Sequence, residues 1–354
     1  MAGLTVRAAP ARTFVTGGAG FIGSELVSAL LADGGEITVL DNLSSAAPDW
    51  VDRMIPTPRL SFVEGDAASA PTVRAAMAGH DRVVHLAAGT DIAAGHGHPE
   101  RDFASGIVAT EVVCEAMREH GIRELWYASS GVVYGHPTRT PTAEDDGPLR
   151  PESHYAAAKV AGEAIIAGFA HLYDWRAFAF RFGNTVGARS DHGVVHDFVV
   201  KLLRDPTRLE ILGDGSQAKP YVAVDDLVAG MRHAADRAPL RPLTVLNLGP
   251  EGTLLVRRVA ELVIEAIGLS SDAVELSFSG AAPGGGGWPG DTAVVEFDIS
   301  AARALGWQPR ASASAAVQAA ARGIAATYRA TGRPLLTSQE RRAAARLVPG
   351  PGLR

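Results

Sequence analysis

The chain has 354 residues, of which 47% are hydrophobic and 20% charged, so it is long enough for one large domain or two joined ones and is not wholly disordered. Its formal net charge of −6 gives no overall positive field, which argues against a protein built to bind nucleic acid or anionic lipid. The one cysteine, Cys114, excludes an intramolecular disulfide framework and a cysteine-based metal cage, and its place in a helical apolar pattern predicts a buried, inert thiol.

Residues 1–11 are predicted to be a short, flexible lead before the first strand. They lack the long apolar core of a signal peptide. No run of about 20 apolar residues occurs in the chain. We therefore expect a soluble, cytoplasmic protein without a membrane partner.

Strands and helices alternate over the first half of the chain. Short apolar strands are predicted at 13–17, 36–41, 59–66, 81–88, 123–130 and 176–184. Helix-patterned stretches are predicted at 21–34, 70–79, 103–121 and from 153 onward. Because the strands are nearly continuous in valine, leucine and isoleucine, the pattern predicts a parallel sheet covered by helices on both faces.

This rhythm changes beyond about residue 185. The following stretch mixes helices, short strands and turns, and it includes a glycine-rich loop, 281–291, that either approaches a ligand closely or only connects two elements. From residue 331 the chain is rich in arginine and proline, and we expect a peripheral tail over 331–354. The sequence thus predicts an α/β protein with a second, smaller region after the sheet.

Three glycines between the first strand and the first helix indicate a dinucleotide site. Gly17, Gly20 and Gly23 permit a tight turn, approach of backbone N–H groups to a pyrophosphate, and close packing of helix on strand. Glycines also serve plain turns, but Asp41 ends the second strand roughly 20 residues on, where a carboxylate accepts hydrogen bonds from ribose hydroxyls. A 2′-phosphate would be repelled there, so NAD is favoured over NADP. Asp66, after the third strand, either meets the adenine or is a simple loop carboxylate.

Tyr155 and Lys159 lie four positions apart in the alanine-rich stretch SHYAAAKVAGEA. Residues i and i+4 share one helix face, so both side chains can point at one ligand. An ordinary helix face is the commoner interpretation of such a pair, but the fifth strand brings Ser129 and Ser130 to the carboxyl edge of the sheet, where ligands bind in open α/β folds. A nearby ammonium and a positive nicotinamide ring would together lower the pKa of the phenol from its usual value of about 10. We therefore interpret the set as catalytic.

Six segments, TGGAGFIG, DNLSS, HLAA, ASSGVVYG, YAAAK and RFGNTVG, resemble the extended short-chain dehydrogenase/reductase family. Within it they are most similar to NAD-dependent nucleotide-sugar epimerases and dehydratases of the UDP-glucose 4-epimerase type. The segments HGVVHDFVVKL, LEILGDGSQ, YVAVDDLVAG and GWPGD also resemble that group, so the likeness covers roughly residues 12 to 325. It is specific for the superfamily and much less so for the substrate.

The resemblance implies a Rossmann-type, doubly wound parallel sheet over 12–184, with later returns near 221–237 and 243–249. It also implies a smaller C-terminal α/β lobe over 185–330 that binds the substrate. NAD is the implied cofactor. Its implied contacts are Gly17, Gly20, Phe21, Ile22, Gly23, Asp41, Asn42, Ser44, Asp66, Ala67, Leu86, Ala87, Ala88, Tyr155, Lys159 and Phe182.

The resemblance further implies a role for each reacting residue. Tyr155 would be the general acid/base, Lys159 would hold the nicotinamide ribose and lower the pKa of the tyrosine, and Ser130 would hydrogen-bond the reacting hydroxyl. Tyr155 would take the proton of the sugar 4-hydroxyl as hydride leaves C4, and the 4-keto sugar would turn over and regain hydride on its other face. The implied contacts to a nucleoside diphosphate sugar are Ser130, Asn184, Arg189, Leu212 and Lys219.

The sequence departs from the family pattern where arginines often clamp the diphosphate. Ala218, Lys219 and Trp288 stand at those places. Arg189 and Lys219 are the cations left to substitute, and a lysine cannot reproduce the bidentate guanidinium fork.

Two further departures lie near the reacting group. Gly106 replaces the usual asparagine in the helix after the fourth strand. Gly131 and Val132 replace the acidic pair that follows the catalytic serine or threonine in 4,6-dehydratases, which counts against elimination chemistry. His96 and His98 share one loop without a third ligand, so we predict a solvated or substrate-facing loop and no metal site.

Two alternatives to C4 epimerisation stay open. The first keeps the fold and changes the outcome to that of a nucleotide-sugar ketoreductase, dehydrogenase or decarboxylase. The second is a non-catalytic NAD-sensing or scaffold protein, against which the complete set of Ser130, Tyr155 and Lys159 speaks. The family likeness alone implies a homodimer paired through the helices near 103–120 and 155–172.

Overall fold

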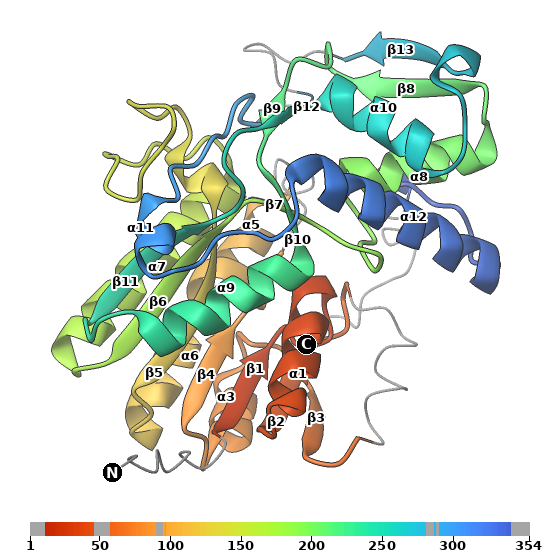
Figure 1. Cartoon of the computed structure of the whole chain (residues 1–354). Coiled ribbons are helices and arrows are strands. Elements are labelled where there is room, and N and C mark those ends of the chain that lie inside the picture. The colour runs from red at the N-terminus through yellow and green to blue at the C-terminus, as the bar shows by residue number, and fades with distance from the viewer. Residues whose placement is uncertain are drawn as a thin grey trace, which may run out of the picture.

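The computed structural model describes residues 11–45, 57–89, 95, 97–280, 287 and 290–340. Its centre is a sheet of seven parallel strands in the order β11-β6-β5-β4-β1-β2-β3 (Figure 1). In chain order they are β1 (Arg12–Thr16), β2 (Glu36–Asp41), β3 (Leu60–Glu64), β4 (Arg82–His85), β5 (Glu124–Ser130), β6 (Arg176–Phe182) and β11 (Leu243–Leu248). Because the strand order reverses between β1 and β4, the sheet is doubly wound.

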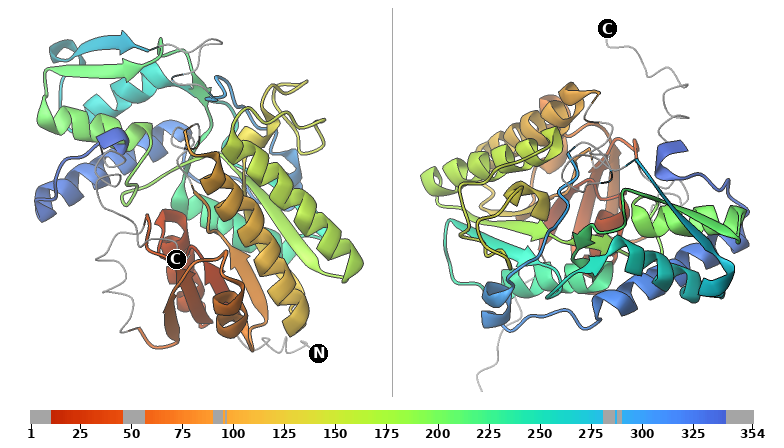
Figure 2. Two further views of the ribbon diagram at one scale, coloured as in Figure 1. Left: turned by 180° about the vertical axis from the view of Figure 1, so that it is seen from behind. Right: turned by 90° about the horizontal axis from the view of Figure 1, so that it is seen from above.

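Helices cover both faces of this sheet. They are α1 (Phe21–Ala32) and α9 (Val224–Arg237) on one face, and α3 (Ala70–Met77), α6 (Ala109–His120) and α7 (His154–Leu172) on the other. Figure 2 shows α6 and α7 side by side along the sheet. Neighbouring residues of β1 show the two layers. Phe14 belongs to the core beneath α3, α6 and α7, Val15 belongs to the core beneath α1 and α9, and both are fully buried. The predicted doubly wound α/β fold is confirmed.

A smaller lobe lies above the upper end of the sheet in Figure 1. It has a second hydrophobic core. Its elements are the parallel strands β8 (Arg208–Leu212) and β13 (Glu275–Ser279) and the helices α8 (Val194–Arg204), α10 (Val256–Ala266) and α12 (Ala313–Thr331). Two short ribbons connect the lobe to the sheet, β7 (Asn184–Val186) with β10 (Tyr221–Ala223) and β9 (Ala218–Lys219) with β12 (Leu254–Leu255). The remaining short helices are α5 (Pro99–Asp102), η1 (Phe103–Val108), η2 (Gly131–Tyr134), η3 (Ser271–Ala273) and α11 (Ser300–Ala304).

The helix predicted over 103–121 is α-helical only from Ala109, because it is preceded by the π-helical turn η1. Around that turn, Thr110 Oγ1 donates to the carbonyl of Gly106 at 2.6 Å, and Ser105 Oγ donates to the carbonyl of Arg101 at 2.8 Å. Such side-chain bonds compete with the regular backbone ladder of an α-helix.

The strand predicted over 176–184 also differs, because it ends at Phe182 and a new strand, β7, begins at Asn184. The N–H of Gly183 still donates to Leu248 of β11, whereas the N–H of Asn184 donates to the carbonyl of Pro220. The chain therefore changes its pairing partner at this point and leaves the central sheet.

Part of the predicted tail packs on the smaller lobe. Ser338 Oγ donates to Asp197 of α8 at 2.7 Å, and Arg204 forms an ion pair with Glu340 at 2.7 Å. Residues 341–354 lie outside the described residues, as do residues 1–10 and most of the glycine-rich loop 281–291.

Two predictions about the whole chain concern Cys114 and membranes. Cys114 is fully buried in α6, as predicted, and burial raises the pKa of its thiol, which is typical of an unreactive cysteine. Among the helices that the structure describes, none is both long and apolar enough to cross a bilayer.

Candidate active site

The carboxyl ends of β1, β4, β5 and β6 meet at one edge of the sheet, where the strand order reverses. The glycine turn follows β1, the segment Leu86–Ala88 follows β4, and Ser130 and Phe182 end β5 and β6. Helix α7 begins at the same edge with Ser153 as its N-cap, whose Oγ accepts the N–H of Ala156 at 3.1 Å. The fold therefore brings most of the predicted site residues together.

The glycine turn forms a cradle that side chains would fill. Gly17 has a φ of 70°, and a Cβ atom there would lie 2.6 Å from the nitrogen of Ala87. A Cβ atom on Gly23 would lie 2.2 Å from the carbonyl oxygen of Gly17. Helix α1 begins at Phe21, directly after its N-cap residue Gly20. No side chain caps its N-terminus, and its first turn contains no acidic residue. Its N-terminal N–H groups and the cradle fit a pyrophosphate.

Asp41 lies at the end of β2, beside the glycine turn. Its Oδ2 accepts the N–H of Ala19 at 2.9 Å, and its Oδ1 accepts the N–H of Leu43 at 2.9 Å. Burial raises the pKa of Asp41, and the hydrogen bonds from Leu43 and Ala19 act against that rise. A carboxylate fixed by two backbone donors keeps lone pairs for the hydroxyls of a ribose and disfavours a 2′-phosphate.

Asn42 and Asp66 lie together at the ends of β2 and β3. Nδ2 of Asn42 donates to Asp66 at 3.1 Å, and Oδ1 of Asn42 accepts the N–H of Ser44 at 3.1 Å. Asp66 also accepts the N–H of Ala68 at 2.8 Å, while Ala67 is buried. Asp66 is thus hydrogen-bonded within the protein at the end of β3, and its contact with an adenine stays one of the two alternatives.

The segment after β4 passes directly beside the glycine turn. The N–H of Leu86 donates to the carbonyl of Thr16 at 3.0 Å, and the N–H of Ala87 donates to Thr16 Oγ1 at 3.3 Å. Behind this segment, the fully buried His85 lies 2.7 Å from Thr16 Oγ1 and 3.1 Å from Thr110 Oγ1. Burial lowers the pKa of His85 to about 3, so this histidine is neutral near pH 7.

Tyr155 occupies the first turn of α7, and its side chain is hydrogen-bonded to Ser130. Burial raises the pKa of Tyr155 to about 12, the bond with Ser130 acts against that rise, and the carboxylate of Asp102 adds to it. Lys159 Nζ lies 5.7 Å from the centre of the tyrosine ring. Burial therefore outweighs the hydrogen bond with Ser130, and the lowering expected from Lys159 together with a positive nicotinamide ring stays a prediction. The buried Asp102 is a neighbour that the sequence pattern did not indicate.

Lys159 is buried one turn farther along α7, with 2% of its surface exposed. Its Nζ donates to the carbonyl of Ala128 at 2.6 Å and lies 4.8 Å from the centre of the Tyr127 ring. Burial lowers the pKa of Lys159 to about 8, and the charge of Glu163 acts against that lowering. The lysine is thus a cation held against β5 in a place that nearly excludes solvent.

Behind this lysine lies a buried ion pair that sequence reasoning missed. Glu163 accepts from Arg181 Nε at 3.0 Å, from Arg181 Nη2 at 2.7 Å and from Ser129 Oγ at 2.5 Å. Arg181 Nη1 donates to the carbonyl of Glu144 at 3.0 Å, and its guanidinium lies 4.7 Å from the centre of the Tyr134 ring. The signal in the sequence was the position of Glu163 four residues after the lysine, on the same helix face.

Close packing accompanies both glycines that depart from the family pattern near the reacting group. Gly131 and Val132 form the turn η2 after β5, and a Cβ atom on Gly131 would lie 2.5 Å from the ring of Phe297. Gly106 is buried in η1, and a Cβ atom there would lie 2.7 Å from Cβ of Ala158 in α7. A side chain at Gly131 or Gly106 would therefore require its neighbour to shift.

Two of the predicted substrate contacts are exposed at strand ends. Asn184 is exposed at the start of β7, and Leu212 is 42% exposed at the end of β8. Phe278, on the neighbouring strand β13, is also 41% exposed. The amide of Asn184 and the apolar side chains of Leu212 and Phe278 are thus exposed to solvent on the side of the smaller lobe.

The two predicted substrate-binding cations are already paired within the protein. Arg189 forms an ion pair with Glu25 of α1 at 2.7 Å. Lys219 is buried, forms an ion pair with Asp291 at 2.8 Å and donates to the carbonyl of Thr292. Neither cation therefore offers an undivided positive charge to a diphosphate, and Trp288 lies outside the described residues.

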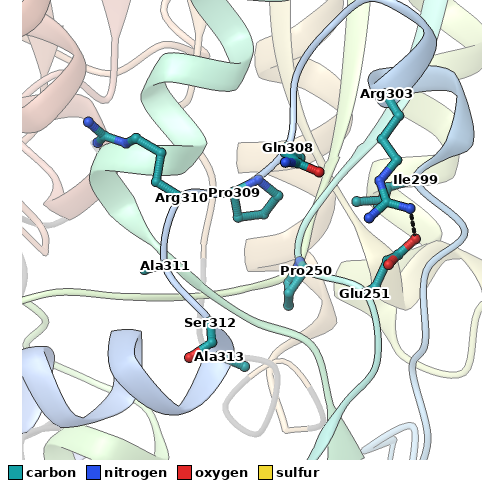
Figure 3. A pocket seen from close by; sticks show the side chains of 10 residues that line it. All are labelled: Pro250, Glu251, Ile299, Arg303, Gln308, Pro309, Arg310, Ala311, Ser312 and Ala313. Atoms are coloured by element: carbon teal, nitrogen blue, oxygen red, sulfur yellow. Dashed lines mark hydrogen bonds and ion pairs between the residues drawn. The ribbon is translucent and has the colours of Figure 1, made fainter.

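No cluster of three histidine, cysteine or acidic side chains able to hold a metal occurs in the part of the chain that the structure describes. His98 Nδ1 lies 3.1 Å from Glu100 Oε1, and His96 lies outside the described residues. A hollow between the loop after β11 and the segment before α12 is lined by Pro250, by the ion pair of Arg303 with Glu251 and by residues 308–313 (Figure 3). None of the predicted site residues lines it.

The glycine cradle and Asp41 lie at the carboxyl edge of the sheet, where the strand order reverses. These features define the chain as an NAD-binding Rossmann protein. The model of the NAD dependent epimerase/dehydratase family matches residues 13–249, and the chain belongs to this family. It is therefore an enzyme of the nucleotide-sugar epimerase/dehydratase family, and its cofactor is NAD.

Relatives with two different activities are similar to this chain. A UDP-glucose 4-epimerase of Mycolicibacterium smegmatis is 35% identical, over 89% of this chain and 97% of the relative. A dTDP-glucose 4,6-dehydratase of Streptomyces griseus is 34% identical, over 74% of this chain and 80% of the relative. A crystal structure of UDP-galactose 4-epimerase matches with a TM-score of 0.78 and 34% identity, over 89% of this chain and 99% of that one.

Proposed function

We propose that this protein epimerises a nucleoside diphosphate sugar at C4 through a transient 4-keto sugar, with Ser130, Tyr155 and Lys159 as its catalytic residues. The observation that carries the choice of epimerisation over dehydration is the packing at Gly131. The acidic pair of 4,6-dehydratases would have to stand at residues 131 and 132, and a side chain at the first of these places would require Phe297 to shift. A dehydratase needs a general acid for the departing hydroxyl, and this edge of the site does not supply one there.

When bound, NAD supplies the acceptor and then the donor of the hydride at C4 and adds a positive ring beside the phenol. Tyr155 takes the proton of the 4-hydroxyl in the first half of the reaction and returns it in the second. Ser130 holds the same oxygen by a hydrogen bond, since its side chain already meets that of Tyr155. Lys159 holds a positive charge near the base and binds the nicotinamide ribose.

The substrate lies in this proposal between the sheet edge and the smaller lobe. Asn184 contacts the sugar, and the exposed Leu212 and Phe278 offer apolar surface to the base. Arg189 and Lys219 face the diphosphate with charges that are shared with Glu25 and Asp291. The proposal therefore predicts weaker diphosphate binding than two free arginines would give.

The test is incubation of the purified protein with UDP-, dTDP- and GDP-sugars, with the products identified by NMR. A 4-epimerase interconverts the gluco and galacto forms of one nucleotide sugar without net formation of NADH. A 4-keto-6-deoxy product would overturn the proposal in favour of a dehydratase, and stoichiometric NADH would overturn it in favour of a dehydrogenase or decarboxylase. Turnover of no sugar in a protein that binds NAD would favour a sensing or scaffold role.

We also propose a division of the chain and its assembly as a homodimer. The NAD-binding part would comprise residues 12–184 with the returns near 221–237 and 243–249, and the substrate lobe mainly 185–330. Two copies would pair through α6 and α7, near which the apolar side chains of Phe103, Leu172 and Tyr173 are exposed. Sedimentation equilibrium of the intact chain tests this, and a monomer at micromolar concentration would contradict it.

A further inference from the structure

One face of α7 contacts the last three residues of β5, Ala128–Ser130, with three successive turns. Tyr155 is hydrogen-bonded to Ser130, Lys159 donates to the carbonyl of Ala128, and Glu163 accepts from Ser129. The spacing of four residues between these side chains places them on a common helix face. Glu163, Lys159 and Tyr155 therefore form one row of side chains. Tyr155 and Lys159 have roles in the proposed mechanism, whereas Glu163 has none there.

Glu163 follows Lys159 by one helical turn on this face, and its charge acts to raise the pKa of the lysine against the effect of burial. The groups that face Lys159 from the other packed elements are Tyr127 of β5 and His85 of β4. Burial raises the pKa of Tyr127 and lowers the pKa of His85 to about 3, so both are neutral near pH 7. On α7 itself the neutral phenol of Tyr155 is the other neighbour.

Arg181 of β6 is the remaining charged group, and it lies beyond the acid. Its guanidinium meets both oxygens of Glu163 with 5% of the arginine side chain and 9% of the acid exposed. Its other contacts, the carbonyl of Glu144 and the ring of Tyr134, lead away from the lysine. Of the two members of the pair, only Glu163 acts on the charge of Lys159.

A buried ion pair is a poor source of stability, because apolar residues of the same volume often do as well or better. We propose that Glu163 is a positioning residue of this active site: its carboxylate keeps the buried Lys159 charged and, through Ser129, fixes the strand end that presents Ser130. The effect of Glu163 on turnover rests on the proposed function, whereas its effect on the charge of Lys159 does not.

The chain makes this charge directly measurable, because it contains only three lysines, Lys159, Lys201 and Lys219. NMR of protein with ¹³Cε- and ¹⁵Nζ-labelled lysine, titrated from pH 6 to 11, follows each ammonium, and Lys201→Arg and Lys219→Arg assign the other two signals. We expect Lys159 to titrate with a midpoint of about 8 in the wild type. Glu163→Gln lowers that midpoint, since the opposing charge is lost.

Two further variants separate charge from packing. Glu163→Asp keeps the charge and shortens the side chain, so the Lys159 midpoint stays closer to the wild type than in Glu163→Gln. Glu144→Gln makes the same acid-to-amide change on the far side of Arg181 and leaves the midpoint unchanged. If Glu163→Gln does not fold, the double variant Glu163→Gln/Arg181→Gln carries no unpaired charge, and its Lys159 midpoint still falls because only the acid of the pair acts on the charge of Lys159.

Activity adds a second measurement once a substrate is in hand. In Glu163→Gln, the alkaline limb of the kcat profile moves to lower pH, because each unit by which the lysine pKa falls lowers the protonated fraction up to about tenfold above that pKa. KM changes little, and Glu144→Gln keeps the wild-type profile. A folded Glu163→Gln protein with an unchanged Lys159 midpoint would overturn the inference. A lowered midpoint in a protein that epimerises no sugar would support it and refute the proposed function.

Discussion

The cofactor side and the sugar side of the candidate site differ in what they offer a ligand. On the cofactor side the pyrophosphate would meet backbone N–H groups at the start of α1, in a cradle kept open by Gly17 and Gly23. On the sugar side the diphosphate would meet Arg189 and Lys219, both of which already share their charge with acids of the protein. Backbone donors are fixed by the fold, whereas a side-chain cation is available only to the extent that no other partner claims it.

The largest effect is expected where the two sides meet, at the base. Tyr155→Phe removes the proton acceptor and leaves the cradle unchanged, so we expect turnover to fall by about 10² to 10⁴ while NAD affinity stays within a few-fold. Product NMR and calorimetric titration with NAD measure the two quantities. Tyr173→Phe makes the same change on an exposed tyrosine and is expected to be silent. Full activity in Tyr155→Phe would mean that another group is the base.

The next effect tests how firmly Lys219 is held on the sugar side. Lys219→Met leaves Asp291 buried without its partner, and we expect the free energy of unfolding to fall by about 3–5 kcal/mol in urea titrations. Adding Asp291→Leu removes the stranded charge and restores most of that stability. A loss below about 1 kcal/mol, the range of exposed pairs, would show that the lysine is free to serve a diphosphate.

Lys159 lies on the cofactor side and is buried. Its protonation therefore makes the free energy of unfolding depend on pH. Its pKa falls from 10.5 to about 8 on folding. Between these values the unfolded chain binds more protons than the folded one, so stability rises with pH through this window by about 3 kcal/mol and is flat below pH 8. The measurement is the difference in unfolding free energy between the wild type and Lys159→Met at pH 7 to 10.5. Parallel curves would show that the lysine is not buried as a cation.

The smallest effect is expected from a methyl group in the cradle. Gly23→Ala places a Cβ atom 2.2 Å from the carbonyl oxygen of Gly17, so the turn must shift, at a cost of about 1–3 kcal/mol. We expect the Kd for NAD to rise about 10- to 100-fold, measured by calorimetry. Gly168→Ala on the exposed side of α7, where no atom lies within 4 Å of the new methyl group, is the control. Unchanged NAD binding in Gly23→Ala would show that the cradle at Gly23 does not hold the cofactor.

Three predicted elements show which features of the fold a local sequence pattern can predict. The strand predicted over 36–41 is β2 residue for residue, because its apolar run ends at Asp41 where the backbone turns. The helix predicted over 103–121 begins with a π-helical turn, which the apolar periodicity of the sequence does not predict. The strand predicted to end at 184 ends at Phe182, because Asn184 pairs with a segment near Pro220.

By itself the sequence determined the fold class and the glycine turn, because the alternation of apolar strands with helices and the spacing of glycines act within one or two adjacent elements. The resemblance of short segments to a known family gave the family. It also placed Tyr155 and Lys159 on one helix face, since a spacing of four residues is a property of the helix alone. Only the tertiary structure decided which charges are paired. Lys219 meets Asp291 across 72 residues and Arg189 meets Glu25 across 164, and no local pattern relates residues so far apart. The same distance in sequence concealed the contact of Glu163 with Arg181 and Ser129, because strands β5 and β6 become neighbours of α7 only when the sheet has formed.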